Sequence, residues 1–222
     1  MPGYKQFVSE FSAETVFLQT QGYFEDDDVD KGVCAALSYM WASENLDGTF
    51  KLDEWRPRET RFKFSGVPMN SGIGKQFPDL VMPTIHAQKV KPGSKFVQKL
   101  YEVEFRTSSG DAILKIGRKD GRLIKRVAKI SGNVGGADVG ENLKRYKASF
   151  LNGYGILTFS MKKGGHAVAF QATEGQFQLY DANLGHFKTS SWRRMKELIS
   201  SAFQAADYNC RNLSFYSVGR VS

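Results

Sequence analysis

The chain has 222 residues, of which 41% are hydrophobic, so its length and composition allow one folding unit with a substantial core. Its 31 Lys and Arg against 23 Asp and Glu give a net charge of +8, which favours association with anionic partners. Cys34 and Cys210 are the two cysteines, too few for a disulfide framework. Together with three widely spaced histidines they exclude a zinc site of the usual kind, and we expect neither metal nor cofactor.

The first residues, MPGYKQFVSEFSAE, lack the apolar core of a signal peptide. Nor does any apolar run approach the roughly 18 residues that a membrane-spanning helix needs. We therefore expect a protein that works with reduced thiols and reaches any membrane by another route.

An apolar stripe predicts a helix over residues 32–48. Val33, Leu37, Met40 and Trp41 recur at the three- and four-residue spacing of a helix face, and the polar residues 45–48 are expected to end it. Cys34 would lie in the first turn.

The central region, residues 49–150, is interrupted by proline and glycine. One helix is expected near residues 94–105, and the glycine-rich run SGNVGGADVG at residues 131–140 predicts a loop. Residues 85–150 hold 15 Lys and Arg against six Asp and Glu, a surplus of nine. We interpret this segment as a basic insertion in one domain that spans residues 1–222, and an anionic membrane surface is its candidate partner.

The last third predicts three antiparallel strands, a helix and a final strand. The strands cover residues 154–161, 166–172 and 177–183, and tight turns join them. An amphipathic pattern predicts a helix over residues 190–206, followed by a strand over 213–221. A helix that carries a cysteine near the start and an antiparallel sheet that carries a histidine near the end indicate an α+β fold with a cleft between them.

The residues of the second hairpin favour nucleophilic chemistry at Cys34. A turn at Glu174 and Gly175 pairs Val168 with Asp181 and sets His166 opposite Asn183. His166 and Asp181 then share a face as diagonal neighbours, close enough for one hydrogen bond between imidazole and carboxylate. A thiol at a helix start needs such a base, and the base needs an orienting group, so Cys34, His166 and Asp181 are the predicted catalytic residues.

Three short blocks, residues 32–44, 155–172 and 177–186, resemble the YopT/AvrPphB group of bacterial effector cysteine proteases, peptidase family C58. The resemblance implies a papain-like fold in which a helix bearing the nucleophile packs on an antiparallel sheet. It also implies a virulence effector or toxin that is secreted without a signal peptide, by a type III- or type VI-like route, and cleaves proteins in a target cell. The family's substrates do not transfer to this chain.

The second oxyanion donor is where the sequence departs from the family pattern. The family commonly places Asn or Gln upstream of the cysteine, where this chain has the acidic run around Asp28. An ionised carboxylate cannot donate a hydrogen bond, so Asp28 would serve beside the backbone of Cys34 only if it were protonated, and Gln21 is the alternative.

Two other function classes stay open. The same thiol chemistry suits a peptidoglycan amidase of the NlpC/P60 type, a deamidase or a transglutaminase. The second class is a non-enzymatic basic module that binds lipid or nucleic acid. Nucleic acid is the weaker candidate partner, because the sequence contains no recognised nucleic-acid-binding motif. His186 is expected to be a surface or capping residue, and Cys210 a structural one.

Overall fold

The computed structural model describes residues 2–18, 33–52, 63–64, 67–68, 113–114, 121–161 and 165–220. The helices of this part are α1 (Pro2–Glu10), α2 (Val33–Asp47), α8 (Gly136–Tyr146) and α9 (Trp192–Ala205), with 3-10 turns at Lys147–Ser149 and Leu151–Gly153. The strands are β1 (Thr15–Leu18), β2 (Lys63–Phe64), β3 (Val67–Pro68), β4 (Arg122–Val134), β5 (Tyr154–Ser160), β6 (Gly165–Thr173), β7 (Gln176–Asp181), β8 (Gly185–Thr189) and β9 (Cys210–Arg220).

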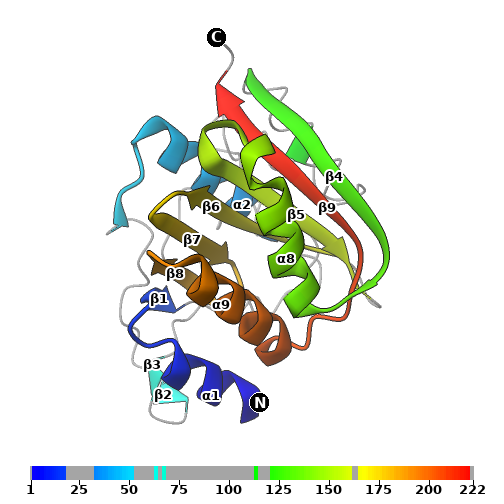
Figure 1. Ribbon diagram of the computed structural model, residues 1–222. Helices are drawn as coiled ribbons and strands as arrows, with labels where there is room; N and C mark the ends of the chain where they lie inside the picture. The colour runs from blue at the N-terminus through cyan, green and yellow to red at the C-terminus, as the bar shows by residue number, and fades with distance from the viewer. Residues whose placement is uncertain are drawn as a thin grey trace, which may run out of the picture.

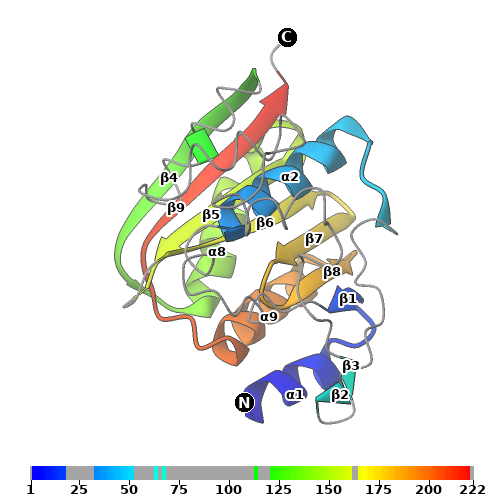
Figure 2. The ribbon, with the colours of Figure 1, turned by 180° about the vertical axis from the view of Figure 1, so that it is seen from behind.

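An antiparallel sheet of seven strands, in the order β1-β8-β7-β6-β5-β9-β4, organises the described part of the chain. Figure 1 shows α8 and α9 on one face of this sheet, and Figure 2 shows α2 crossing the opposite face. The result is a three-layer α+β arrangement, as the sequence predicted. None of the helices in the described residues is long and apolar enough to cross a membrane.

The alternation of side chains along β6 explains why both faces of the sheet are covered. Ala167 and Ala169 lie in the core beneath α2, whereas Val168 and Phe170 lie in the core beneath α9. All four are at most 1% exposed, and β6 is a central strand that is buried everywhere except at its two end residues. Small residues on one face let α2 approach the sheet closely, and large residues on the other fill the space beneath α9.

The predicted helices at residues 32–48 and 190–206 are confirmed as α2 and α9. Gly48, just after α2, has a φ of 71°, the left-handed conformation with which helices often end. Met195, Leu198 and Ile199 on the predicted stripe of α9 are all at most 2% exposed. The three predicted strands are β5, β6 and β7, and the predicted final strand is β9, which begins three residues earlier than expected.

The prediction of a loop at residues 131–140 was wrong. Residues 131–134 complete β4, and Gly136 begins α8, where Asp138 Oδ2 accepts a hydrogen bond from the backbone N–H of Gly135. A Cβ on Gly136 would lie 2.9 Å from the backbone of Ser200, so the glycine allows α8 to pack against α9. The helix expected near residues 94–105 lies outside the described residues.

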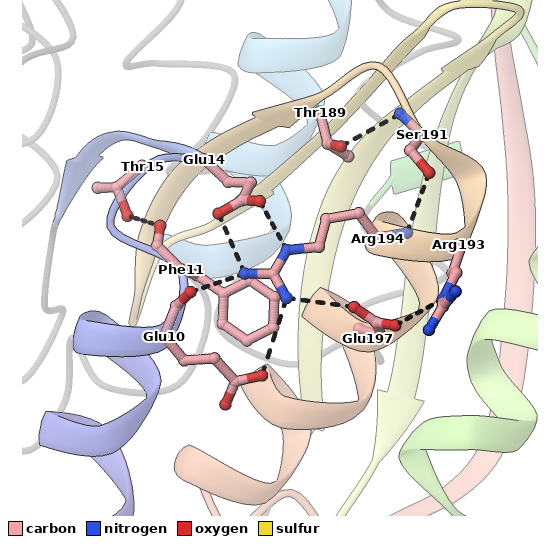
Figure 3. Close-up of polar contacts among 9 residues, drawn as sticks. All are labelled: Glu10, Phe11, Glu14, Thr15, Thr189, Ser191, Arg193, Arg194 and Glu197. Carbon is pink, nitrogen blue, oxygen red and sulfur yellow. Dashed lines mark hydrogen bonds and ion pairs between the residues drawn. The ribbon is translucent and has the colours of Figure 1, made fainter.

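The N-terminal segment is held against α9 by Arg194, as Figure 3 shows. Arg194 Nε donates to Glu14 Oε1 at 2.6 Å, and Arg194 Nη2 donates to the backbone carbonyl of Glu10 at 2.7 Å. Its guanidinium also lies 4.2 Å from the centre of the Phe11 ring, a cation–π contact. Since Phe11 is fully buried, this one side chain joins the end of α1 and the start of β1 to the body of the fold.

Replacing Arg194 with Ala is expected to lower the free energy of unfolding by about 1–3 kcal/mol, because several charge-assisted hydrogen bonds and a cation–π contact are lost together. Urea unfolding measures the loss, and hydrogen exchange of the amides of residues 7–18 locates it. Arg193→Ala is the matched control, since Arg193 is 89% exposed at its side chain and bonds Glu197 across one helical turn. Equal losses in the two variants would contradict this role for Arg194.

Candidate active site

Cys34 is the second residue of α2, in the first turn as predicted. The unpaired backbone N–H groups and the positive end of the helix dipole at this position favour a thiolate. One turn further along, Ser38 Oγ donates to the carbonyl oxygen of Ala167 at 3.0 Å. Ala167 follows His166 in β6, so Ser38 fixes the helix that carries Cys34 against the strand that carries His166.

The His166 and Asp181 side chains meet in a buried hydrogen bond. His166 Nε2 lies 2.9 Å from Asp181 Oδ1, and the two residues are 2% and 1% exposed. The predicted pairing of Val168 with Asp181 is confirmed, while the ladder between β6 and β7 ends there, before Asn183. Both residues lie at the same end of the sheet, where β6 begins and β7 ends.

Two further residues complete the surroundings of Asp181. The backbone N–H of Asn183 donates to Asp181 Oδ1 at 2.8 Å, an Asx turn between β7 and β8. The hydroxyl of Tyr208 donates to both carboxylate oxygens, at 3.1 and 3.0 Å. With His166, these donors satisfy a carboxylate that would otherwise be costly to bury. Tyr208 gave no signal in the sequence, because it follows α9 and is 27 positions from Asp181.

His166 is held in its charged form by its neighbours. Burial alone would lower the pKa of His166, but charge interactions and hydrogen bonds with Asp181 and Cys34 raise it from 6.5 to about 10. Cys34 is therefore part of the polar surroundings of the imidazole. An imidazole with a thiol and a carboxylate as neighbours is an arrangement suited to nucleophilic sulfur chemistry.

The other predicted residues divide into two groups. Cys210, the first residue of β9, is 1% exposed, and burial together with the charge of Asp181 raises the pKa of its thiol to about 12. It is consequently an unreactive neighbour of the site, as a structural cysteine would be. Asp28 and Gln21 lie outside the described residues. Among the described residues, no group of three or more His, Cys, Asp and Glu side chains could hold a metal ion.

His186 is a core residue, so its prediction as a surface or capping residue was wrong. It lies in β8 and is 2% exposed, and its ring contacts the edges or faces of Trp41 and Phe50 at centroid distances of 5.3 and 5.7 Å. Its Nε2 is 2.8 Å from Gln178 Oε1. The short strand β8 was not predicted, and this is why the histidine was misplaced.

Acid is expected to destabilise the protein through His186, because burial, aided by the charge of Lys188, lowers its pKa to about 3. Between the usual pKa of 6.5 and this value the unfolded chain binds a proton that the folded chain excludes. The free energy of unfolding should therefore decrease as the pH is lowered across this range. The contribution of this residue is at most about 1.4 kcal/mol per pH unit. Urea unfolding over a pH series should show a shallower acid slope for His186→Gln, and identical slopes would contradict the assignment.

Comparisons with known proteins agree with this geometry. The family model of the Yersinia/Haemophilus virulence surface antigen, peptidase family C58, matches residues 91–215, which include His166, Asp181 and Tyr208 and begin after Cys34. The crystal structure of the Pseudomonas avirulence protein AvrPphB superposes with a TM-score of 0.52 at 18% identity, covering 94% of this chain and 99% of that one.

A second similar structure is PatoxP, a cysteine protease-like domain of the Photorhabdus asymbiotica toxin PaTox. It superposes with a TM-score of 0.51 at 10% identity, covering 98% of this chain and 57% of that one. No curated protein sequence matches the chain. The family match extends over more than half of the sequence, and both structures share the fold. The chain therefore belongs to the Yersinia/Haemophilus virulence surface antigen family, peptidase family C58, and has the papain-like α+β fold of these cysteine protease-like effectors.

Proposed function

We propose that this protein is a cysteine peptidase in which Cys34 is the nucleophile, His166 the general base and acid, and Asp181 the residue that orients His166. The observation that carries the proposal is the buried 2.9 Å hydrogen bond between His166 and Asp181, beside a thiol at a helix start. A buried histidine paired with a carboxylate on one side and a thiol on the other has the geometry of an activated nucleophile. Membership of a peptidase family supports the same proposed function.

Each side chain has a defined part in the proposed reaction. Nε2 of His166 is taken by Asp181 and Tyr208, so Nδ1 is the ring nitrogen left to accept the thiol proton. The Cys34 thiolate attacks the peptide carbonyl carbon, and the imidazolium returns the proton to the departing amine. Water then loses a proton to His166 and attacks the thioester, which releases the carboxylic acid and regenerates the thiol.

The oxyanion of the tetrahedral intermediate would be held by backbone N–H groups. The N–H of Cys34 is among the first of α2, which have no partner within the helix. Asp28 in its protonated form, or Gln21 in its place, is the proposed second donor.

The substrate class proposed here is a protein of a target cell, which fits a family of virulence effectors. The proposed place of action is the inside of a target cell, which the protein would reach by secretion. A single peptidase domain over residues 1–222 and a basic segment at 85–150 remain proposals too. Within that segment, Lys125, Arg126 and Lys129 are exposed on the edge strand β4, where an anionic membrane surface would meet them.

Mass spectrometry of new protein N-termini in target-cell lysate tests the function directly. Wild type is expected to generate a small set of new N-termini that Cys34→Ala does not generate. Cys210→Ala is the matched control and should keep the wild-type pattern, because its buried thiol takes no part. If Cys34→Ala yields the same cleavages as wild type, the proposal fails. Release of muropeptides from cell walls without protein cleavage would indicate the amidase alternative instead.

A further inference from the structure

Tyr208 contacts both His166 and Asp181 through a single hydroxyl group. Its oxygen lies 2.9 Å from His166 Nε2 and 3.1 and 3.0 Å from the two carboxylate oxygens of Asp181. The side-chain amide of Asn183 also donates to this hydroxyl, at 2.9 Å. Three polar groups from the β6, β7 and β7–β8 segments therefore converge on one atom.

The Asp181 carboxylate accepts from His166 Nε2, and the proton this requires on Nε2 sets the hydrogen-bonding roles at the Tyr208 hydroxyl. A carboxylate only accepts, so the hydroxyl proton must point to Asp181. Amide and imidazolium N–H groups only donate, so Asn183 and His166 use the two lone pairs of the oxygen. Burial first, and then the charge of Asp181, raises the pKa of Tyr208 well above its usual 10, so the group keeps its proton at any working pH.

The local backbone fixes the Tyr208 ring before any contact with the site. Helix α9 ends in a Schellman motif, in which the N–H of Tyr208 bonds the carbonyl of Phe203 at 2.9 Å and the N–H of Asp207 bonds that of Gln204 at 3.1 Å. Asp207 takes the left-handed conformation of this motif, with a φ of 54°. The end of α9 thus fixes the backbone position from which the Tyr208 side chain extends.

Aromatic packing fixes where the phenol points. The Tyr208 ring packs on the Phe203 ring, with centroids 5.3 Å apart, and on the Phe159 ring at 5.2 Å. Its centroid is 4.9 Å from that of the His166 imidazole, at an interplanar angle of 38°. Tyr208 therefore covers the side of the His166–Asp181 hydrogen bond that faces α9 and keeps water from competing for it.

We propose that Tyr208 is a positioning residue of the site: its hydroxyl holds the His166 imidazole and the Asp181 carboxylate in register, with Asn183 aiming that hydroxyl. The inference rests on the proposed function, since it assigns to Tyr208 the task of keeping His166 beside Cys34. Tyr208 acts through His166 and does not touch the reacting atoms. Its contribution is to keep the imidazole where it can take the proton of Cys34.

The test is the pH profile of Cys34 alkylation by iodoacetamide, a probe that needs no knowledge of the substrate. Tyr208→Phe keeps the ring and removes the oxygen. At about pH 6 the variant is expected to alkylate about tenfold more slowly than wild type, since a misplaced imidazolium leaves more of Cys34 as thiol. At about pH 9 the rates should converge, because an ordinary thiol is then largely thiolate without help.

Matched variants separate positioning from packing. Tyr146→Phe, at the end of α8 against Phe215, should leave the profile unchanged, and Asn183→Ala should shift it in the same direction as Tyr208→Phe but less. Thermal unfolding of each variant checks the fold. Superimposable profiles for wild type, Tyr208→Phe and Asn183→Ala would overturn the proposal for Tyr208 and leave the proposed function standing. A wild-type Cys34 that reacts with the profile of an ordinary thiol would overturn the proposed function itself.

Discussion

Replacing His166 with Ala is expected to lower turnover of a protein substrate by about 10⁴-fold or more, the size of effect seen when a residue of a catalytic triad is removed. The variant keeps Cys34 but has no base for its proton and no acid for the leaving amine. Asp181 would lose the imidazole that it orients, so little of its own contribution could survive. Single-turnover cleavage of the first identified target protein measures the loss.

The control for this variant is His186→Gln, which changes the other buried histidine of the described residues and spares the proposed site. Its turnover should stay within about threefold of wild type at neutral pH, where His186 is uncharged in the folded protein. Comparable losses in the two histidine variants would mean that stability, and not proton transfer, governs the measurement. Turnover that survives His166→Ala would contradict the assigned base.

Trp41→Ala is expected to have the largest effect on stability, about 3–5 kcal/mol of the free energy of unfolding. Trp41 is fully buried beneath the sheet and stacks on Tyr180, with ring centroids 6.0 Å apart and planes 5° from parallel. Phe50 and His186 contact it edge-on. Removing the indole would leave a large cavity between α2 and β7, a serious loss for a domain whose total stability is of the order of 10 kcal/mol.

Urea unfolding provides the measurement, with Trp192→Ala as the matched tryptophan control. Trp192 is partly exposed at the start of α9 and packs on Phe177 at 5.1 Å, so its removal should cost clearly less. Because α2 carries Cys34, Trp41→Ala should also slow alkylation of that thiol at acid pH. A loss below about 1 kcal/mol would show that α2 is not anchored through this ring.

The sequence predicted those helices and strands that have a clear local signal, either an apolar stripe or a tight turn at one end. The apolar stripes of α2 and α9 and the tight turns between β5, β6 and β7 were recognisable, and the Glu174–Gly175 turn set the register that joins His166 to Asp181. That register follows from local geometry, because a two-residue turn fixes every pair beyond it. The α+β class followed from the order of these elements.

The elements that were missed, such as β4 and α8, have local sequences that do not indicate the structure they adopt in contact with the rest of the fold. β4 is an edge strand with many exposed residues, and its Lys and Arg side chains hide the alternation that predicts a strand. α8 begins with glycines because Ser200 of α9 lies close to its backbone, and those glycines resemble a loop. Tyr208 could not be found at all, since its approach to Asp181 depends on where α9 ends and β9 begins.

Covalent labelling of the native protein with an epoxysuccinyl inhibitor, mapped by mass spectrometry, tests the central claim most directly. In the proposed site His166 activates Cys34, whereas burial raises the pKa of the Cys210 thiol to about 12. The predicted result is a single adduct on Cys34 in folded wild type, with none on Cys210 and none on Cys34 in His166→Ala or in the unfolded chain. Native protein that remains unlabelled at Cys34, or an unfolded chain that labels equally fast, would contradict a thiol activated by His166.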